Sequence, residues 1–270
     1  SIEDLQKGEL WGEKMEFSYD SKLLNNILDI VSMKGKWLGS TGLTNDSLGE
    51  YVKVIKTNEG FRTGLYFLNA NASTYVSYYI PEVVEKEEEY VIEIAKFQKY
   101  LKSMDNDVTV TIAEGGCQIT NENKAASFPS AIVHPNESAI NMFFKSKDTA
   151  FFGGEAEPLT WGKTVLESSV VLLAEEFIDA MKALENVGHG IYSMSIRENS
   201  LNFTTNKDNR EGFSTSYVAQ TIGDAVVDFT GPLYKSLPKT ESLSINFNDD
   251  SVIVICTPNV TIGRAPYVVV

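Results

Sequence analysis

Hydrophobic and polar positions along the chain follow two periods, one of about 3.6 residues and one of two residues, which predict helices and strands in turn. A period of 3.6 places one apolar face on each of four segments. The predicted helices span residues 21–34, 95–104, 174–187 and 231–239. Ser21, preceded by Asp20, is a candidate N-cap of the first helix, and Gly188 is a natural stop for the third.

Each predicted helix is followed by segments of period two, which indicate antiparallel strands joined by tight turns. The turn signals are Asn58-Glu59-Gly60, Glu114-Gly115-Gly116, Glu198-Asn199 and Asn248-Asp249-Asp250. A unit of one helix and antiparallel strands therefore recurs four times, with two units in each half of the chain. Residues 134–163 lie between the halves and show no steady period, which favours a long connector between two domains. The alternative is an ordinary insertion within one domain.

Composition allows a large core and disfavours several classes of protein. The chain has 270 residues, of which 43% are hydrophobic and 22% charged, enough for one large domain or two of ordinary size. The net charge of −14 argues against a general binder of polyanions, although a local basic surface can lie on an acidic body.

Catalytic and metal-binding signals are absent from the sequence. The phosphate-binding glycine loop, the dinucleotide fingerprint and the Gly-x-Ser-x-Gly elbow do not occur, so we do not expect an enzyme. Cys117 and Cys256 do not combine with His134 and His189 in zinc-type spacing, so we expect buried free thiols and no metal or cofactor. The sequence has no apolar run long enough for a membrane span, and its start does not resemble a signal peptide. Five Asn-x-Ser/Thr sequons keep a secreted glycoprotein as a lesser alternative.

Several stretches are informative because they occur together, in one order and at one set of separations. They are "DSKLLNNILDIVS", "NEGFRTGLYFLNANASTYVSYYIP", "YVIEIAKFQKYLKSMDNDVTVTIAEGGCQIT", "AEEFIDAMKALENV" with "YSMSIRENSLNFTTNKDN", and the final "GRAPYVVV". Together they resemble the DNA sliding clamp family, which includes proliferating cell nuclear antigen and the clamps of T4-like phages. The chain departs from the family pattern in its longer connector, its apolar tail and its first 16 residues, so it resembles a divergent member.

The resemblance implies a fold and an assembly. The fold class would be α+β, with two similar sliding-clamp-type domains that each pack two helices on antiparallel β-sheet. The domains would span residues 15–133 and 164–270, joined by a connector at 134–163. Clamps close as rings of six domains, so a two-domain chain implies a homotrimer. The edges that meet would be residues 124–133 of one copy and 212–220 of its neighbour.

The resemblance also implies a function. The protein would be a DNA polymerase processivity factor that encircles duplex DNA without reading its sequence and tethers replication proteins. Its partners would be a DNA polymerase and an ATP-dependent clamp loader, without a cofactor and without a membrane. It would act in the cytoplasm, at a prokaryotic or viral replication site, or in the nucleus, and would not be secreted.

Lysines on the polar faces of the helices are the candidate contacts to DNA. With Phe97 at zero and roughly 100° per residue, Lys96, Lys99 and Lys102 lie at about 260°, 200° and 140°, opposite the apolar face. Such a stripe suits phosphate binding, which is electrostatic and independent of sequence. The candidate DNA-binding residues are Lys96, Lys99, Lys102, Lys235 and Lys239, assisted by Lys22, Lys34 and Lys36. Plain solvation is the alternative for any single helix, and the third helix is acidic on this face.

A partner site is implied by the resemblance alone. Clients of clamps insert a short peptide with apolar anchors between the connector and the C-terminal strand. The matching residues here are Tyr75, Val76, Ile140, Met142, Phe143, Ala265 and Pro266. Alternatively, these residues only close the sheet. The acidic third helix and the apolar tail also leave open a clamp-fold scaffold for protein interactions that does not encircle DNA.

Overall fold

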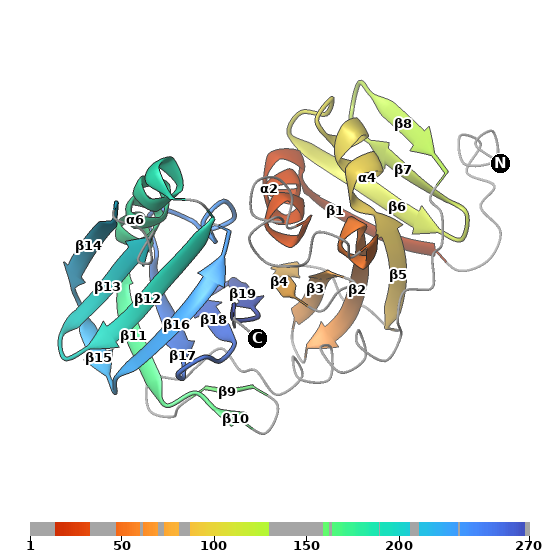
Figure 1. The fold of residues 1–270 in the computed structure, drawn as a ribbon. Helices are drawn as coiled ribbons and strands as arrows, with labels where there is room; N and C mark the ends of the chain where they lie inside the picture. The colour runs from red at the N-terminus through yellow and green to blue at the C-terminus, as the bar shows by residue number, and fades with distance from the viewer. Residues whose placement is uncertain are drawn as a thin grey trace.

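The structure is a computed structural model of the chain (Figure 1). It describes residues 14–32, 47–59, 62–69, 73–80, 87–129, 159–161, 164–188, 190–205, 211–231 and 233–267. We refer to residues 14–129 as the first half and residues 159–267 as the second half. The predicted domain boundaries at residues 133 and 164 stay a prediction.

Three α-helices form within the described residues, close to where the hydrophobic pattern predicts them. They are α2 (Ser21–Ser32), α4 (Ile94–Leu101) and α6 (Ala174–Val187). α4 ends three residues before the predicted Met104 and continues as a turn. Their apolar faces are buried, with Leu24, Phe97 and Phe177 at most 1% exposed, because residues three and four apart share one side of a helix.

Specific side chains fix the ends of these helices. Asp20, rather than the predicted Ser21, caps α2, since Oδ1 of Asp20 accepts a hydrogen bond of 2.9 Å from the main-chain N–H of Leu23. Gly188 ends α6 as predicted, but with a φ of −89°. A Cβ at Gly188 would lie 2.6 Å from Oγ1 of Thr205. Glycine is therefore needed there for close packing and not for a left-handed conformation.

The fourth predicted helix, residues 231–239, does not form. The main-chain N–H of Leu237 donates to the carbonyl of Tyr234 (3.1 Å) and that of Glu241 donates to Pro238 (3.4 Å), so the described residues make two successive turns. Gly231 has a φ of +71°, and Pro238 has no N–H to continue a helical ladder. A segment this short and interrupted does not offset the unfavourable nucleation of a helix. The α+β fold is confirmed, with one α-helix instead of two among the described residues of the second half.

The strands follow the order that the period-two segments predict. The first half contains β1 (Lys14–Asp20), β2 (Tyr51–Glu59), β3 (Arg62–Asn69), β4 (Thr74–Ile80), β5 (Glu88–Glu93), β6 (Asp107–Ala113), β7 (Gly116–Thr120) and β8 (Ala125–Phe128). The second half contains β9 (Thr160–Trp161), β10 (Thr164–Val165), β11 (Ser168–Leu173), β12 (Ile191–Arg197), β13 (Ser200–Thr205), β14 (Phe213–Val218), β15 (Gln220–Ile222), β16 (Ala225–Thr230), β17 (Ser242–Phe247), β18 (Ile253–Cys256) and β19 (Val260–Arg264).

Four repeated units organise these strands. Each unit is a strand, then a helix or the 231–240 turns, then three strands, and the units begin at β1, β5, β11 and β16. The short β15 follows the third unit as an additional strand and pairs with β11. Within each half the two units exchange their first strands. β1 pairs with β6 while β5 pairs with β2, and β11 pairs with β17 while β16 pairs with β12, all antiparallel. Each half is therefore one interwoven body, and neither of its units has a complete sheet alone.

The last strands of the units define how the halves join. β4 ends the first unit and β19 ends the fourth, and these two strands pair antiparallel over five residue pairs. This pairing makes one nine-stranded sheet in the order β15-β11-β17-β18-β19-β4-β3-β2-β5. The last strands of the second and third units, β8 and β14, lie at the edges of their four-stranded sheets β1-β6-β7-β8 and β14-β13-β12-β16.

The main core lies between the sheets and the helices and extends through both halves. Figure 1 shows α2 on the side of the first half that is towards the second half, α4 beside β5 and β6, and α6 near the top of the second half. Cys117 and Cys256 are buried thiols that form no disulfide, as predicted. In the described part of the chain, no helix combines the length and apolar character that crossing a membrane requires. The described ranges also hold no group of His, Cys, Asp or Glu side chains arranged to bind a metal ion.

Candidate functional site

The lysines of α4 lie on the side of the helix away from the core. Lys99 and Lys102 are exposed and Lys96 is half-buried, while Phe97 and Leu101 pack inward. Nζ of Lys99 also lies 5.4 Å from the centre of the Tyr100 ring. The second-helix stripe of Lys96, Lys99 and Lys102 is therefore accessible as a group, which a phosphate-binding surface requires.

α2 contributes Lys22, which is exposed in the first turn of the helix. The side chain of Asp20 at the cap places a carboxylate nearby, so we expect Lys22 to add less positive charge than the stripe on α4. Lys34 and Lys36 lie outside the described residues.

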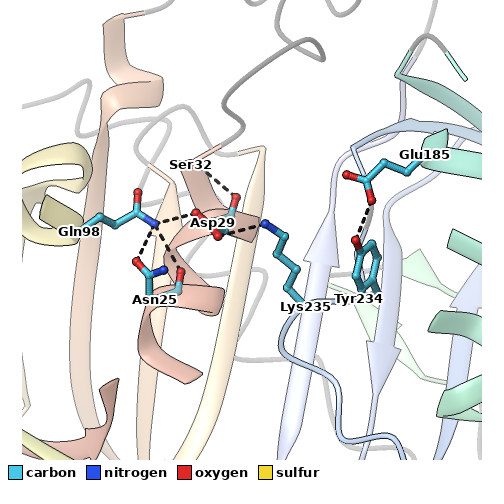
Figure 2. A network of polar contacts seen from close by, with 7 residues as sticks. All are labelled: Asn25, Asp29, Ser32, Gln98, Glu185, Tyr234 and Lys235. Atoms are coloured by element: carbon cyan, nitrogen blue, oxygen red, sulfur yellow. Dashed lines mark hydrogen bonds and ion pairs between the residues drawn. The ribbon is translucent and has the colours of Figure 1, made fainter. Parts of the chain in front are cut away.

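Lys235 forms an ion pair within the chain that the sequence did not indicate. Its Nζ lies 3.1 Å from Oδ2 of Asp29 on α2, and Nε2 of Gln98 on α4 donates to Oδ1 of the same carboxylate at 2.8 Å. Figure 2 shows Asp29 between Gln98 and Lys235. Nε2 of Gln98 also donates to Oδ1 of Asn25. Asn25 and Asp29 are four residues apart on the polar face of α2, and this spacing was the sequence signal that could have predicted a polar network there. The carboxylate offsets the charge of Lys235 and reduces its value for binding phosphate.

These contacts align the helices into one continuous surface, which we name the helix face. It runs from α4 through α2 to the 233–240 turns, and from there to α6. The link to α6 is a hydrogen bond of 2.6 Å from Tyr234 Oη to Oε2 of Glu185, also drawn in Figure 2. Lys239 is exposed in the second turn of this segment. The structure therefore brings the described candidate lysines onto elements that lie side by side.

The α6 end of the helix face is acidic. Glu175 and Asp179 are exposed. Lys182 is exposed as well, and its Nζ lies 5.8 Å from the centre of the Tyr234 ring. Positive charge therefore gathers on the first half of the helix face, on α4 and the start of α2.

The candidate partner residues lie on the nine-stranded sheet, but not all on one face. Tyr75 packs with Ile55, Tyr66 and Leu68 on the face away from the main core. Val76 points to the opposite face, into the main core, and is fully buried. For Val76 the structure therefore supports the alternative that it only closes the sheet.

Tyr75 is covered by an aromatic contact with Trp161 of β9. The two rings are stacked, with centroids 5.0 Å apart and planes at 24°. Gly263 on β19 is required for this packing, because a Cβ there would lie 2.4 Å from Cε1 of Tyr75. Tyr75 is only 1% exposed, so a partner cannot reach it unless Trp161 moves.

Among the candidate partner residues that the structure describes, Ala265 and Pro266 remain accessible. Both are half-buried directly after β19, and the main-chain N–H of Ala265 donates to the carbonyl of Ser73 at 2.8 Å. This bond places them beside the start of β4, close to Tyr75. Ile140, Met142 and Phe143 lie outside the described residues.

Three buried tyrosines of the first half are expected to make the stability of the fold depend on alkaline pH. Tyr19, Tyr75 and Tyr78 each have a pKa raised well above 10.0, chiefly because burial disfavours the phenolate. Above pH 10 the unfolded chain loses these protons and the folded chain keeps them, so the free energy of unfolding is expected to fall as pH rises through and beyond about 10.

Urea unfolding measured between pH 8 and pH 11 checks this prediction. The double variant Tyr19→Phe with Tyr78→Phe removes two of the hydroxyls and should make the alkaline decline shallower. A decline of the same steepness in the variant would contradict the assignment.

Sequence comparisons give no relative. No protein-family model matches the chain, and no curated protein matches it. Solved structures do match. The PCNA2–PCNA3 complex of Sulfolobus tokodaii is 13% identical with a TM-score of 0.60, over 93% of this chain and 99% of that chain. A. fulgidus PCNA bound to the C-terminal region of FEN-1 is 11% identical with a TM-score of 0.60, over 94% and 99%.

The chain has the sliding-clamp fold. The DNA polymerase III subunit beta of Borrelia burgdorferi also matches, at 10% identity and a TM-score of 0.63, over 95% of this chain and 65% of that one. The clamp fold therefore covers both halves of this chain. The chain spans the whole length of the PCNA chains and about two thirds of the beta subunit.

Proposed function

We propose that the protein is a DNA sliding clamp, a ring of three copies that encircles duplex DNA and tethers a DNA polymerase. The internal repeat carries the proposal. β4 and β19, the last strands of the first and fourth units, pair inside the chain, and β8 and β14 are the equivalent strands of the second and third units. Pairing of β8 with β14 of the next copy would repeat the internal junction and remove both exposed edges.

The exposed edge of β14 supports this assembly. Along β14, exposed side chains alternate with half-buried side chains, and Val218 at the end of the strand is 89% exposed. An edge strand with an exposed apolar residue invites pairing with another chain. Light scattering of the ring should give a mass close to three times 29.9 kDa.

The helix face supports the DNA contact. In a closed ring it would line the hole, where Lys96, Lys99 and Lys102 would screen phosphate charge without reading bases. The acidic body, with a net charge of −14, would repel DNA elsewhere. The contact must be weak and interchangeable, because a sliding ring cannot hold one phosphate.

Client proteins would bind on the nine-stranded sheet beside Tyr75, Ala265 and Pro266. The neighbouring A. fulgidus structure holds the C-terminal region of FEN-1, and by that likeness we propose a peptide partner here. The polymerase and an ATP-dependent clamp loader are the proposed clients. Movement of Trp161 would be needed to admit a side chain against Tyr75.

Retention on DNA of different topology tests encirclement. The protein is assembled in the presence of nicked circular plasmid and passed through gel filtration at high salt. A clamp should stay with the circle and be released when a restriction enzyme linearises it. A single-chain mass at every concentration, together with equal retention on circles and linear DNA, would contradict the clamp.

A second candidate is a clamp-fold scaffold that binds proteins without encircling DNA. It is favoured by the acidic end of the helix face at Glu175 and Asp179 and by the ion pair between Lys235 and Asp29. A scaffold would keep its partners in the absence of DNA and show no dependence on plasmid topology.

A further inference from the structure

We infer that Arg264 is the positioning residue that holds the two halves of the chain in one fixed orientation. Arg264 is the last residue of β19 and is 2% exposed. Its Nη2 donates to the carbonyl of Ile30 in the last turn of α2 at 3.0 Å, and its Nη1 donates to the carbonyl of Thr230 at the end of β16. One guanidinium thus bonds the main chain of both halves. This inference does not depend on the proposed function.

The end of α2 is suited to a buried cation. The last four carbonyls of a helix lack partners within it and carry the negative end of the helix dipole. Arg264 takes the carbonyl of Ile30, Nδ2 of Asn69 donates to that of Val31 at 2.5 Å, and Oγ of Ser32 donates to that of Asp29 at 3.0 Å. Side chains from β3 and β19 therefore complete this helix end.

Burial opposes the charge of Arg264 without removing it. Burial lowers the pKa of its guanidinium to about 9, so the group is still protonated at neutral pH. Withdrawing it would remove a hydrogen bond from each of two main-chain carbonyls, and hydrogen bonds to charged groups are among the stronger ones in proteins. The fork-shaped guanidinium also fixes the direction of both bonds.

Other polar links also join the halves and constrain their orientation less. The main-chain hydrogen bond from Ala265 to the carbonyl of Ser73 extends the β4–β19 pairing. The Asp29–Lys235 pair is about a third exposed on both side chains, and such pairs contribute little. The hydrogen bond from Tyr78 Oη to the carbonyl of Ser236 is single, at 3.1 Å. The β4–β19 pairing joins the halves but, like any two-strand junction, permits a range of twist. Arg264 selects one orientation from that range.

Spin-label distances between the halves test the inference. Labels are placed at Glu114→Cys and Glu198→Cys, exposed turn residues of the two halves, while Cys117 and Cys256 stay unlabelled because they are buried. The parent should give one narrow distance distribution, and Arg264→Met should give a broader or shifted one. The matched control is Arg197→Met, because Arg197 is exposed and, within the described residues, its guanidinium donates to the carbonyl of its neighbour Ile196; it should keep the narrow distribution.

Amide hydrogen exchange gives a second readout. In Arg264→Met the amides of the β4–β19 ladder should exchange roughly tenfold faster or more, and those of the β6–β7 ladder at the parent rate. The inference would be overturned if Arg264→Met and Arg197→Met gave the same distance distribution. It would also be overturned if Arg264→Met raised exchange equally in the β4–β19 and β6–β7 ladders. If Arg264→Met does not fold, exchange in the unchanged protein decides. If the β4–β19 amides exchange only through global unfolding, the inference is supported. If they exchange through a separate opening of the junction, with a free energy lower than that of global unfolding, the inference is overturned.

Discussion

Replacing Lys96, Lys99 and Lys102 together with alanine is expected to shorten the DNA products made by the polymerase that the protein stimulates, without unfolding the protein. The three side chains lie on the side of α4 away from the core, with Lys99 and Lys102 exposed and Lys96 half-buried, so their loss removes charge and little packing. Each lost phosphate contact should make the logarithmic salt dependence of duplex binding shallower by about 0.9, or roughly 3 for the whole stripe. A processivity assay on primed circular DNA and a salt titration of duplex binding measure the two effects.

A charge-matched control separates a local contact from net charge. Lys99→Ala with Lys102→Ala removes two positive charges, and so does Lys14→Ala with Arg197→Ala, at exposed positions outside the helix face. Only the first pair should shorten products and flatten the salt dependence. Product lengths that are equal in parent and triple variant, and no longer than those of polymerase alone, would reject the clamp and leave the scaffold.

Proline in the outer edge of β14 is expected to dissociate the ring into single chains. Successive N–H groups point to opposite edges of a strand. One of the two variants Ser214→Pro and Thr215→Pro therefore removes an N–H from the open edge of β14, and the other removes an N–H from the β13–β14 ladder. The outward variant should keep the thermal stability of the single chain and weaken each subunit contact on the order of 100-fold. Because a ring repeats that contact three times, it should not close.

Light scattering and plasmid retention report the outcome. The control is Ile222→Pro on β15, another edge strand, which lies outside the residues proposed to meet in the ring, so the assembled mass should persist. If both β14 variants keep the mass of the parent, the β8–β14 pairing is wrong. A mass of one chain in the parent itself would reject the ring before any variant is made.

The sequence alone determined the local elements of this protein. α6 begins and ends where the pattern predicts, because an apolar face of period 3.6 and the glycine at position 188 are both local signals. The β6–β7 hairpin likewise follows from period two and Gly115, which takes a φ of +88° that favours glycine. The four repeats and the accessible lysines of α4 could also be predicted, because they too follow from local patterns in the sequence.

The fourth helix shows where local pattern was insufficient. The segment 231–239 has an apolar face with Leu233 and Leu237, and both are buried. Apolar spacing, however, reports which residues turn inward and not which backbone conformation brings them there. Two successive turns bury the same leucines, and the missing N–H of Pro238 and the short length of the segment both disfavour a helix there.

Only the tertiary structure decided the contacts between distant segments. The exchange of first strands between units, the stacking of Trp161 on Tyr75, and the pairing of Lys235 with Asp29 join residues with no sequence signal in common. Arg264 is the clearest case. Its type predicts exposure, yet it is buried because the carbonyls of Ile30 and Thr230, 200 residues apart, converge on its guanidinium only after both halves have folded.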